Sequence, residues 1–353
     1  MKSFKHIAAV ILLVASGTRL HAAAALFLEE PFGGFGEMNP TGHAAIYLSN
    51  VCAESPTHLR PCRPGESGVV ISRYHRVAGY DWIAIPLIPY LYAVEQAGQV
   101  PASVDAGSVA QLRDSYRRIY LHDLVPDGPE GAAPAGEWIQ LVGSSYDRKI
   151  YAFEIETSPE QDEQLMTLLN SEPNRSHFNL LFHNCADFSR RAINTYYPKA
   201  AHRSLIADAG ITTPKQIAKT LVSYSKHHSD LWFTEFEIPQ VAGSVRRSKP
   251  VRGVCESLMR SKKYAVPLIA LHPWIGGSIA VAYLTRGLFN PERQAVKLEN
   301  PFDVERALVS ADPQRRQAVP VAQTAKGIAW GSDAQTSSLE TRETSASSLN
   351  LVP

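Results

Sequence analysis

The stretch FHNCADFSRR, residues 182–191, constrains the fold most, because it places a thiol where an extended run meets a helix. The run FNLLF, residues 178–182, is β-like, and the residues after Cys185 predict a helix. The first turn of a helix carries unpaired backbone N–H groups and the positive end of the helix dipole, which favour negative charge. Since the thiolate is the reactive form of cysteine, this position is expected to lower the thiol pKa from about 8.5. Cys185 is therefore the candidate nucleophile.

The composition is that of a globular protein and excludes nucleic-acid binding. The chain has 353 residues, enough for one large domain or two smaller ones. Hydrophobic residues make up 44% and charged residues 20%, as in ordinary folded domains. The formal net charge of +1 provides neither a basic footprint for nucleic acid nor an acidic field for a cationic partner.

The N-terminus has the three-part pattern of a secretory signal peptide. Lys2 and Lys5 give a positive start, residues 7–15 are apolar, and small residues at 22–25 suit cleavage. We predict a signal peptide over residues 1–25, with an uncleaved N-terminal anchor as the alternative. In either case we expect an exported domain, in the periplasm or cell envelope, where disulfides persist.

The four cysteines form one close pair and two separate thiols. Cys52 and Cys62 flank a short segment that contains two prolines, and they predict a disulfide that closes a surface loop. A zinc site is the alternative, but the spacing is not the short CxxC kind and no second ligand pair follows. Two alternatives to a nucleophilic Cys185 stay open: a disulfide with Cys255, and a buried structural thiol.

The hydrophobic pattern and the capping residues predict an α+β layout. We expect an antiparallel pair of strands over 43–49 and 68–77. Two further strands are expected within residues 138–157, and another just before Cys185. Capping chemistry predicts helices that start at Ser158 and Thr213; further helices are expected over 108–120 and from Cys185 to just before Pro198. Loops or irregular segments are expected over 26–42, 50–67, 81–96 and 126–136.

The stretch 264–285 contains no charged residue and approaches the length of a membrane-spanning helix. Internal prolines and a Gly-Gly pair oppose one continuous helix, and the basic residues 260–263 precede it, against the positive-inside tendency. The alternatives are a membrane-embedded segment, a buried pair of short helices and a segment that lies on a membrane. We therefore treat 241–309 as an apolar helical segment with potential membrane contact, and 310–353 as a disordered tail.

Acyl chemistry by a thiol requires a base, a polar group that orients the base, and donors for the oxyanion. Of twelve histidines, His183 is close to Cys185 in sequence, but its side chain can easily point elsewhere. His43 opens a strand just after a glycine, where it can face a helix N-terminus. His43 is the candidate base.

These residues resemble the circularly permuted NlpC-like papain fold, which includes the lecithin:retinol acyltransferase-like proteins and related bacterial cysteine hydrolases. The resemblance covers roughly residues 40–200. It is carried by an HxAIY motif at His43–Tyr47 and by the Asn184–Cys185 pair that opens a helix. It implies an antiparallel sheet packed on helices over 26–240, with histidine before cysteine in the chain. Reversed order has no physical cost, because a catalytic triad is a spatial arrangement.

The resemblance also implies a third polar residue on the next strand. Ser72, Tyr74 and His75 are the candidates, and strand alternation puts His75 on the face opposite to the other two. We select His75 for this role. Asn184 is a candidate support for the oxyanion site, although a cap residue there has a purely structural explanation.

The sequence therefore predicts an exported cysteine hydrolase or acyltransferase that works through an acyl-enzyme. The substrate is an amide or ester, either in cell-wall peptide or in a lipid, and no metal or organic cofactor is implied. The alternative is a non-catalytic envelope protein that uses the same fold for binding or scaffolding.

Overall fold

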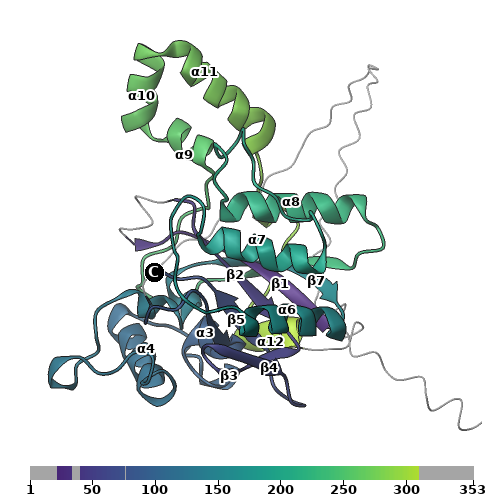
Figure 1. Ribbon diagram of the computed structural model, residues 1–353. Coiled ribbons are helices and arrows are strands. Elements are labelled where there is room, and N and C mark those ends of the chain that lie inside the picture. The colour runs from purple at the N-terminus through teal and green to yellow at the C-terminus, as the bar shows by residue number, and fades with distance from the viewer. Residues whose placement is uncertain (1–21, 34–39, 76, 310–353) are drawn as a thin grey trace, which may run out of the picture. The chain divides into compact units, whose positions relative to one another are not determined.

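The computed structural model describes residues 22–33, 40–75 and 77–309. It contains a seven-stranded sheet in the order β6-β5-β2-β1-β7-β8-β9 and a separate two-stranded sheet, β3-β4 (Figure 1). The strands are β1 (Ala22–Glu29), β2 (His43–Leu48), β3 (Val51–Ser55), β4 (His58–Pro61), β5 (Val69–Ser72), β6 (Ile83–Pro86), β7 (Ile150–Thr157), β8 (Phe233–Ile238) and β9 (Val296–Lys297).

Helices cover the large sheet, so the α+β prediction is confirmed. They are α3 (Leu87–Tyr92), α4 (Ala106–Tyr120), α5 (Ser144–Asp147), α6 (Pro159–Ser171), α7 (Cys185–Tyr196), α8 (Pro214–His227), α9 (Val254–Arg260), α10 (Lys262–Leu271), α11 (Pro273–Ala282) and α12 (Pro301–Val309). The paired strands are antiparallel except β8 and β9, which makes the sheet mixed rather than wholly antiparallel.

The central strand is β1, which the sequence analysis assigned to the end of a signal peptide and to a loop. It pairs with β2 on one side and with β7 on the other, and all its residues are buried. A strand covered on both faces lacks the alternation of apolar and polar residues, so its run of alanines looked like a cleavage region. The predicted loop over 26–42 is thus wrong for residues 26–29. The rest of the predicted signal peptide, residues 1–21, lies outside the described residues.

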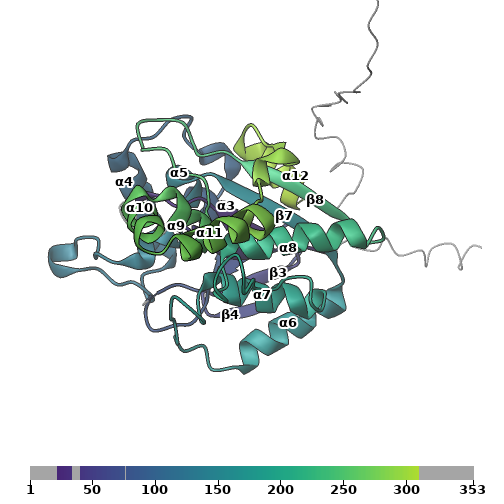
Figure 2. The same cartoon turned by 90° about the horizontal axis from the view of Figure 1, so that it is seen from above.

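Two hydrophobic cores lie on the two faces of the sheet. Phe27 and Tyr47 point into the first core, with side chains of α3, α4 and α12. Leu26 and Ile46 point into the second core, with side chains of α6, α7 and α8. Figure 2 shows α6 and α7 side by side, and α9, α10 and α11 grouped together. Since β9 and α12 belong to the sheet and its first core, only the middle of the predicted segment 241–309 stands apart.

The capped helices agree with their predicted starts. Ser158 caps α6 in a capping box with Gln161, and Thr213 caps α8 through the backbone N–H of Gln216. The helix predicted over 108–120 is α4, and the strands predicted over 43–49 and 68–77 contain β2 and β5, which pair antiparallel as expected.

Four segments differ from their predictions. Residues 50–67 contain the hairpin β3–β4 rather than only a loop. Residues 81–96 contain β6 and α3 rather than an irregular segment. Their two prolines lie at the end of β6 and in the first turn of α3, where proline is tolerated. Residues 138–149 form a 3-10 turn and α5 instead of a strand, so only β7 follows. The run 178–182 is a turn, because the side chain of Asn179 accepts from the N–H groups of Leu181 and Phe182.

The charge-free stretch forms most of α10 and α11, two short helices that contact each other. Together with α9 we call them the arm (residues 254–288). Pro273 opens α11, and the breaks around His272 split the stretch into two pieces. Within the described residues, no helix combines the length and the hydropathy that crossing a bilayer requires. The tail predicted as disordered, 310–353, lies outside the described residues.

The burial of β1 on both faces makes its side chains a direct test of the fold. We expect Phe27→Ala to lower the free energy of unfolding by about 3–5 kcal/mol, because it removes a fully buried ring from the first core. Phe302→Ala is the matched control, since that ring is 54% exposed on α12, and it should change stability by less than about 0.5 kcal/mol. Chemical denaturation measures both; equal losses would contradict the central place of β1.

Candidate functional site

The structure places Cys185 at the first position of α7, as the sequence predicted. Asn184 caps the helix: its side-chain oxygen accepts from the N–H of Asp187 at 2.9 Å. Its amide nitrogen donates to the carbonyl oxygens of Leu180 and Thr212 at 2.9 and 3.0 Å. Both amide protons are thus engaged with backbone carbonyls, so Asn184 fixes the turn that holds Cys185 and is poorly placed to serve as the predicted oxyanion support.

The Cys185 thiol lies against the peptide that joins His43 to Ala44. The backbone N–H groups of Ala44, Ala186 and Cys185 itself act on the sulfur and favour its thiolate. Burial is the larger influence, and it raises the thiol pKa to about 11. The sequence analysis predicted that the helix N-terminus would lower the thiol pKa; in the structure the pKa is raised.

The thiols of Cys185 and Cys255 are not joined to each other. Cys185 and Cys255 are both free, so the structure does not form the disulfide that would occupy Cys185. Cys255 is buried on α9, with its sulfur 3.4 Å from the carbonyl oxygen of Ile206. The predicted disulfide between Cys52 and Cys62 is present and closes the hairpin segment. Although Glu66 lies close to both sulfurs, sulfurs joined in a disulfide are not the thiolates that zinc prefers.

His43 begins β2 and is held by Ser72. The Oγ of Ser72 lies 2.9 Å from Nε2 of His43 and donates its single proton to the carbonyl oxygen of Ala44 at 2.7 Å. The serine oxygen must then accept from Nε2–H, which leaves Nδ1 as the unprotonated nitrogen. Ser72 thus selects the tautomer whose Nδ1 can accept a proton.

The imidazole of His43 is neutral at ordinary pH. Burial lowers its pKa to about 3, and the positive charge of Arg148 acts in the same direction. Together with the raised pKa of Cys185, this means that the resting site holds a neutral thiol and a neutral imidazole.

Ser72 and Tyr74 accompany His43, whereas His75 does not. Tyr74 is buried and stacks on the imidazole, with ring centroids 5.2 Å apart. His75 is exposed, and its ring lies 5.1 Å from that of Phe178. The selection of His75 as the third residue thus disagrees with this geometry, which puts Ser72 in that position. The alternation noted in the sequence already grouped Ser72 with Tyr74 and separated His75 from them.

A buried ion pair that the sequence analysis missed lies beside the histidine. Glu29 stands opposite His43 in the β1–β2 register. Its carboxylate accepts from the Tyr90 hydroxyl and lies 3.0 Å from Arg148. Both charged side chains are almost fully buried. The sequence analysis did not select Glu29 because it assigned residues 26–42, which include Glu29, to a loop.

The two sides of the site come from different faces of the sheet. Following the strand alternation, His43 shares the face of Ala45 and Tyr47, which belong to the first core. Helix α7 packs on the second core, where Cys185 is one of the partly buried neighbours. The thiol and the histidine therefore lie toward different faces of the sheet near the start of β2, and among the described residues their two side chains share no hydrogen bond.

Comparisons of the chain with protein-family models, with curated proteins and with solved structures found no match. The resemblance to the permuted NlpC-like papain fold thus depends on the residues of its two motifs, His43–Tyr47 and Asn184–Cys185.

The depressed pKa of His43 predicts a specific pH dependence of stability. Between about pH 3 and the unfolded value near 6.5, the unfolded chain binds a proton at this ring that the folded chain does not, so stability falls as pH falls through this window. We expect His43→Gln to reduce that slope by up to about one bound proton. The exposed His75→Gln is the control and should leave the slope as in the wild type. Denaturation curves from pH 3 to 8 measure the slope, and an unchanged slope in His43→Gln would contradict a neutral imidazole in the folded chain.

Proposed function

We propose that the chain is a cysteine hydrolase or acyltransferase with a permuted papain-like site, in which Cys185 is the nucleophile and His43 the base. The observation that carries the proposal is the position of the thiol: it lies at the first turn of α7, where the N–H of Ala44 favours its thiolate, and Ala44 directly follows a histidine whose tautomer Ser72 fixes. In this assignment Ser72 is the residue that orients the base.

Because both partners are neutral at rest, the proton must move as the bond forms. Nδ1 of His43 takes the thiol proton while the sulfur attacks the carbonyl carbon of an amide or ester. The imidazolium then gives that proton to the departing amine or alcohol, and the carbon–nitrogen or carbon–oxygen bond breaks. Water, an amine or an alcohol resolves the acyl-enzyme through the same steps in reverse.

The oxyanion requires donors other than Asn184. The backbone N–H groups of Cys185 and Ala186 at the start of α7, and that of Ala44 on β2, each lower the pKa of the thiol and so favour negative charge beside it. A carbonyl oxygen bound beside the sulfur can accept from this set, and the helix dipole adds to the stabilisation of its charge.

Of the two substrate classes, the residues before the nucleophile favour one with an apolar acyl group. Leu180, Leu181 and Phe182 are each about half exposed, and they lie in the turn shortly before Cys185. An exposed apolar cluster next to a site is typical of a surface that binds an apolar ligand. A lipid ester or amide therefore suits the site better than cell-wall peptide.

The second candidate is a non-catalytic protein that retains the fold for binding or scaffolding. It is favoured by the same pKa values, since a thiol raised to about 11 and an imidazole lowered to about 3 are what burial alone produces. The placement of Cys185 and His43 toward different cores also suits this candidate.

Acylation of Cys185 distinguishes the two candidates. We expect p-nitrophenyl octanoate to leave an octanoyl group on Cys185, detected by mass spectrometry of the intact chain and its peptides. Cys185→Ala should abolish the adduct, and His43→Gln should slow its formation by about 10²–10⁴-fold, because the thiol loses its proton acceptor. Cys255→Ala is the matched control and should behave as the wild type. An unmodified Cys185 in a natively folded chain would favour the non-catalytic candidate.

A further inference from the structure

The arm carries the densest group of exposed apolar side chains in the part of the chain that the structure describes. Leu271 and Trp274, at the turn between α10 and α11, are 73% and 72% exposed. The other large exposed apolar side chains of the arm are Val266, Ile269, Val281, Leu284 and Leu288. Soluble domains seldom expose so continuous an apolar surface unless it binds something.

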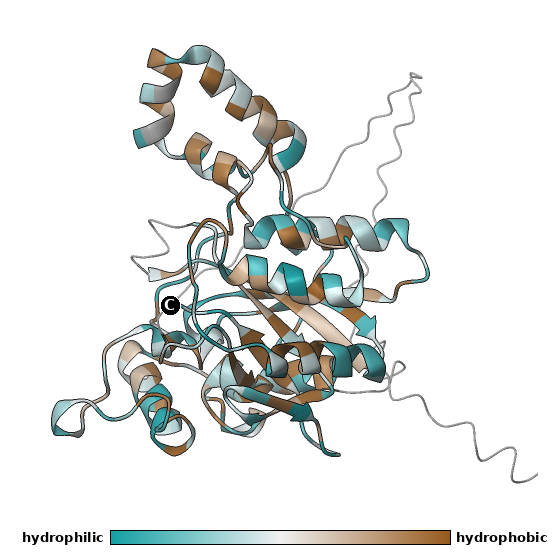
Figure 3. Cartoon of the chain, viewed as in Figure 1, coloured by the Kyte–Doolittle hydropathy of each residue, from teal (hydrophilic) through white to brown (hydrophobic). Residues whose placement is uncertain are grey.

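The apolar residues are not confined to one side of these helices. Along α11, Trp274 and Val281 are exposed, and Ile275 and Ile279 are partly exposed. Figure 3 shows hydrophobic residues on several sides of both helices. A helix that docks in a protein groove has one apolar stripe and one polar face, whereas a helix apolar all round is suited to a continuous apolar medium. The pattern thus favours lipid over a protein partner.

The size of the hairpin suits one leaflet. Helix α10 has ten residues, and α11 has ten before it continues into a π-helical turn that ends at Gly287. Ten residues correspond to about 15 Å at the usual rise. That is about half of the roughly 30 Å hydrocarbon core of a bilayer. At the turn, the N–H groups of Ile275 and Gly276 are satisfied by the carbonyl oxygen of His272, as burial in hydrocarbon requires.

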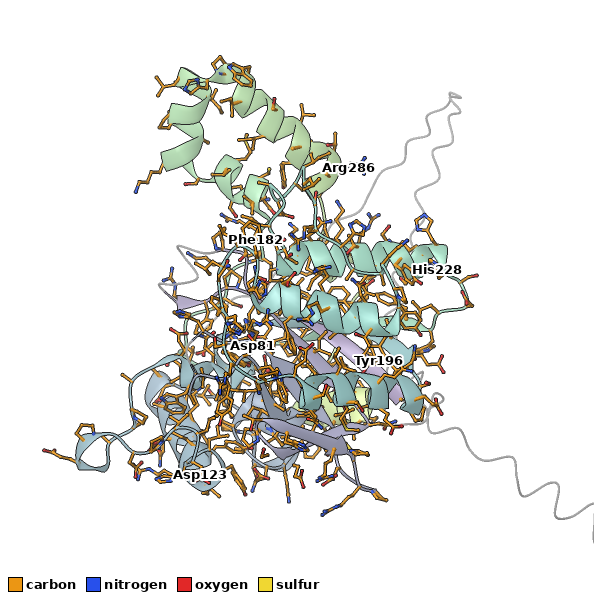
Figure 4. The ribbon with its side chains drawn as sticks, in the orientation of Figure 1. Asp81, Asp123, Phe182, Tyr196, His228 and Arg286 are labelled. Carbon is orange, nitrogen blue, oxygen red and sulfur yellow. A yellow bond between two sulfur atoms is a disulfide. The ribbon has the colours of Figure 1, made fainter. Side chains whose placement is uncertain are left out.

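The charges that flank the hairpin have one sign. From Ser257 to Asn290 the chain contains Arg260, Lys262, Lys263 and Arg286 but neither aspartate nor glutamate. Figure 4 labels Arg286 at the base of the arm. Basic residues next to an apolar insertion strengthen binding to an anionic lipid surface.

The base of the arm is fixed to the domain that holds the thiol. Glu256 on α9 is buried between Lys215 of α8, at 2.6 Å, and Arg260, at 3.1 Å. The loop 204–213 connects both regions: Asp208 accepts from the N–H of Val254 at 2.7 Å, and Thr212 accepts from Asn184 at 3.0 Å. The arm therefore has a defined attachment near the N-terminal turn of α7.

We infer that the arm is a membrane-docking device: the α10–α11 hairpin inserts into one leaflet of an anionic lipid surface, with the flanking basic residues at the headgroups. Phe182 lies on the side of the sheet covered by α7 and α8, the side from which the arm also extends (Figure 4). Insertion thus brings the exposed residues 180–182 and the thiol end of α7 toward the lipid. If the proposed function holds, the acyl substrate is drawn from that surface.

Vesicle sedimentation with the full chain tests the docking. We expect binding to vesicles of equal parts phosphatidylglycerol and phosphatidylcholine, and weaker binding to phosphatidylcholine alone. The double variant Leu271→Ser, Trp274→Ser should weaken binding roughly tenfold or more, because it removes two apolar side chains from the leaflet. Ile119→Ser is the matched control: Ile119 is 69% exposed on α4, away from the arm, and its loss should leave binding unchanged.

Two further measurements locate the contact and separate it from catalysis. Quenching of indole fluorescence by bromine-labelled lipids should be lost in Trp274→Phe, because the large exposed indole lies at the hairpin turn. Cys185→Ala should bind vesicles as the wild type does, so failure of the proposed chemistry leaves the docking result intact.

The inference is overturned if the wild type does not sediment with anionic vesicles, or if the Leu271→Ser, Trp274→Ser variant binds them as tightly as Ile119→Ser does. It is also overturned if light scattering shows a dimer that the double variant converts to a monomer, because a second copy of the chain would then cover the arm. Circular dichroism verifies that each variant is folded, which is expected since the substituted side chains are exposed.

Discussion

The pairing of β1 with β2 and β7 is the constraint on which the site depends. It sets Glu29 opposite His43 and directs Phe27 and Leu26 to opposite cores. Because successive side chains of a strand alternate between faces, a slip of one residue would exchange every contact of β1. With both faces buried, such a slip is strongly disfavoured. The register of one apolar strand thus determines which charged and aromatic groups surround the histidine.

Within that frame, burial outweighs the helix N-terminus in setting the state of the thiol. A helix terminus contributes about 0.3–1 kcal/mol to a nearby charge, up to about 2 kcal/mol in favourable geometry. Full burial can shift a pKa by as much as 3–5 units, and one unit corresponds to about 1.4 kcal/mol. The thiol pKa of about 11 at the first turn of α7 agrees with this ranking. A cysteine at a helix start is therefore not sufficient evidence of a thiolate.

The parts of the fold that local chemistry determines could be predicted from the sequence. The caps Ser158, Asn184 and Thr213 can be recognised from the few residues around them, and a helix begins directly after each of them. The parts that depend on tertiary burial could not: β1 is apolar throughout because both faces are covered. The residue beside the histidine could have been predicted, because strand alternation groups Ser72 with Tyr74, and both contact His43 in the structure. Cys185 and His43 were found because each opens an element whose start the sequence indicates.

Burial is the main reason why the site rests in its neutral form, and the buried pair of Glu29 and Arg148 acts in the same direction. The negative charge of Glu29 raises the pKa of Cys185, and the positive charge of Arg148 lowers the pKa of His43. Both effects oppose a thiolate beside an imidazolium, although the two charges balance each other overall. Ser72 adds to this, because a hydroxyl on Nε2 fixes the tautomer without the negative charge that would stabilise an imidazolium. A site built this way is expected to rely on transient proton transfer during attack, with the backbone N–H groups at the start of α7 carrying the stabilisation of developing negative charge.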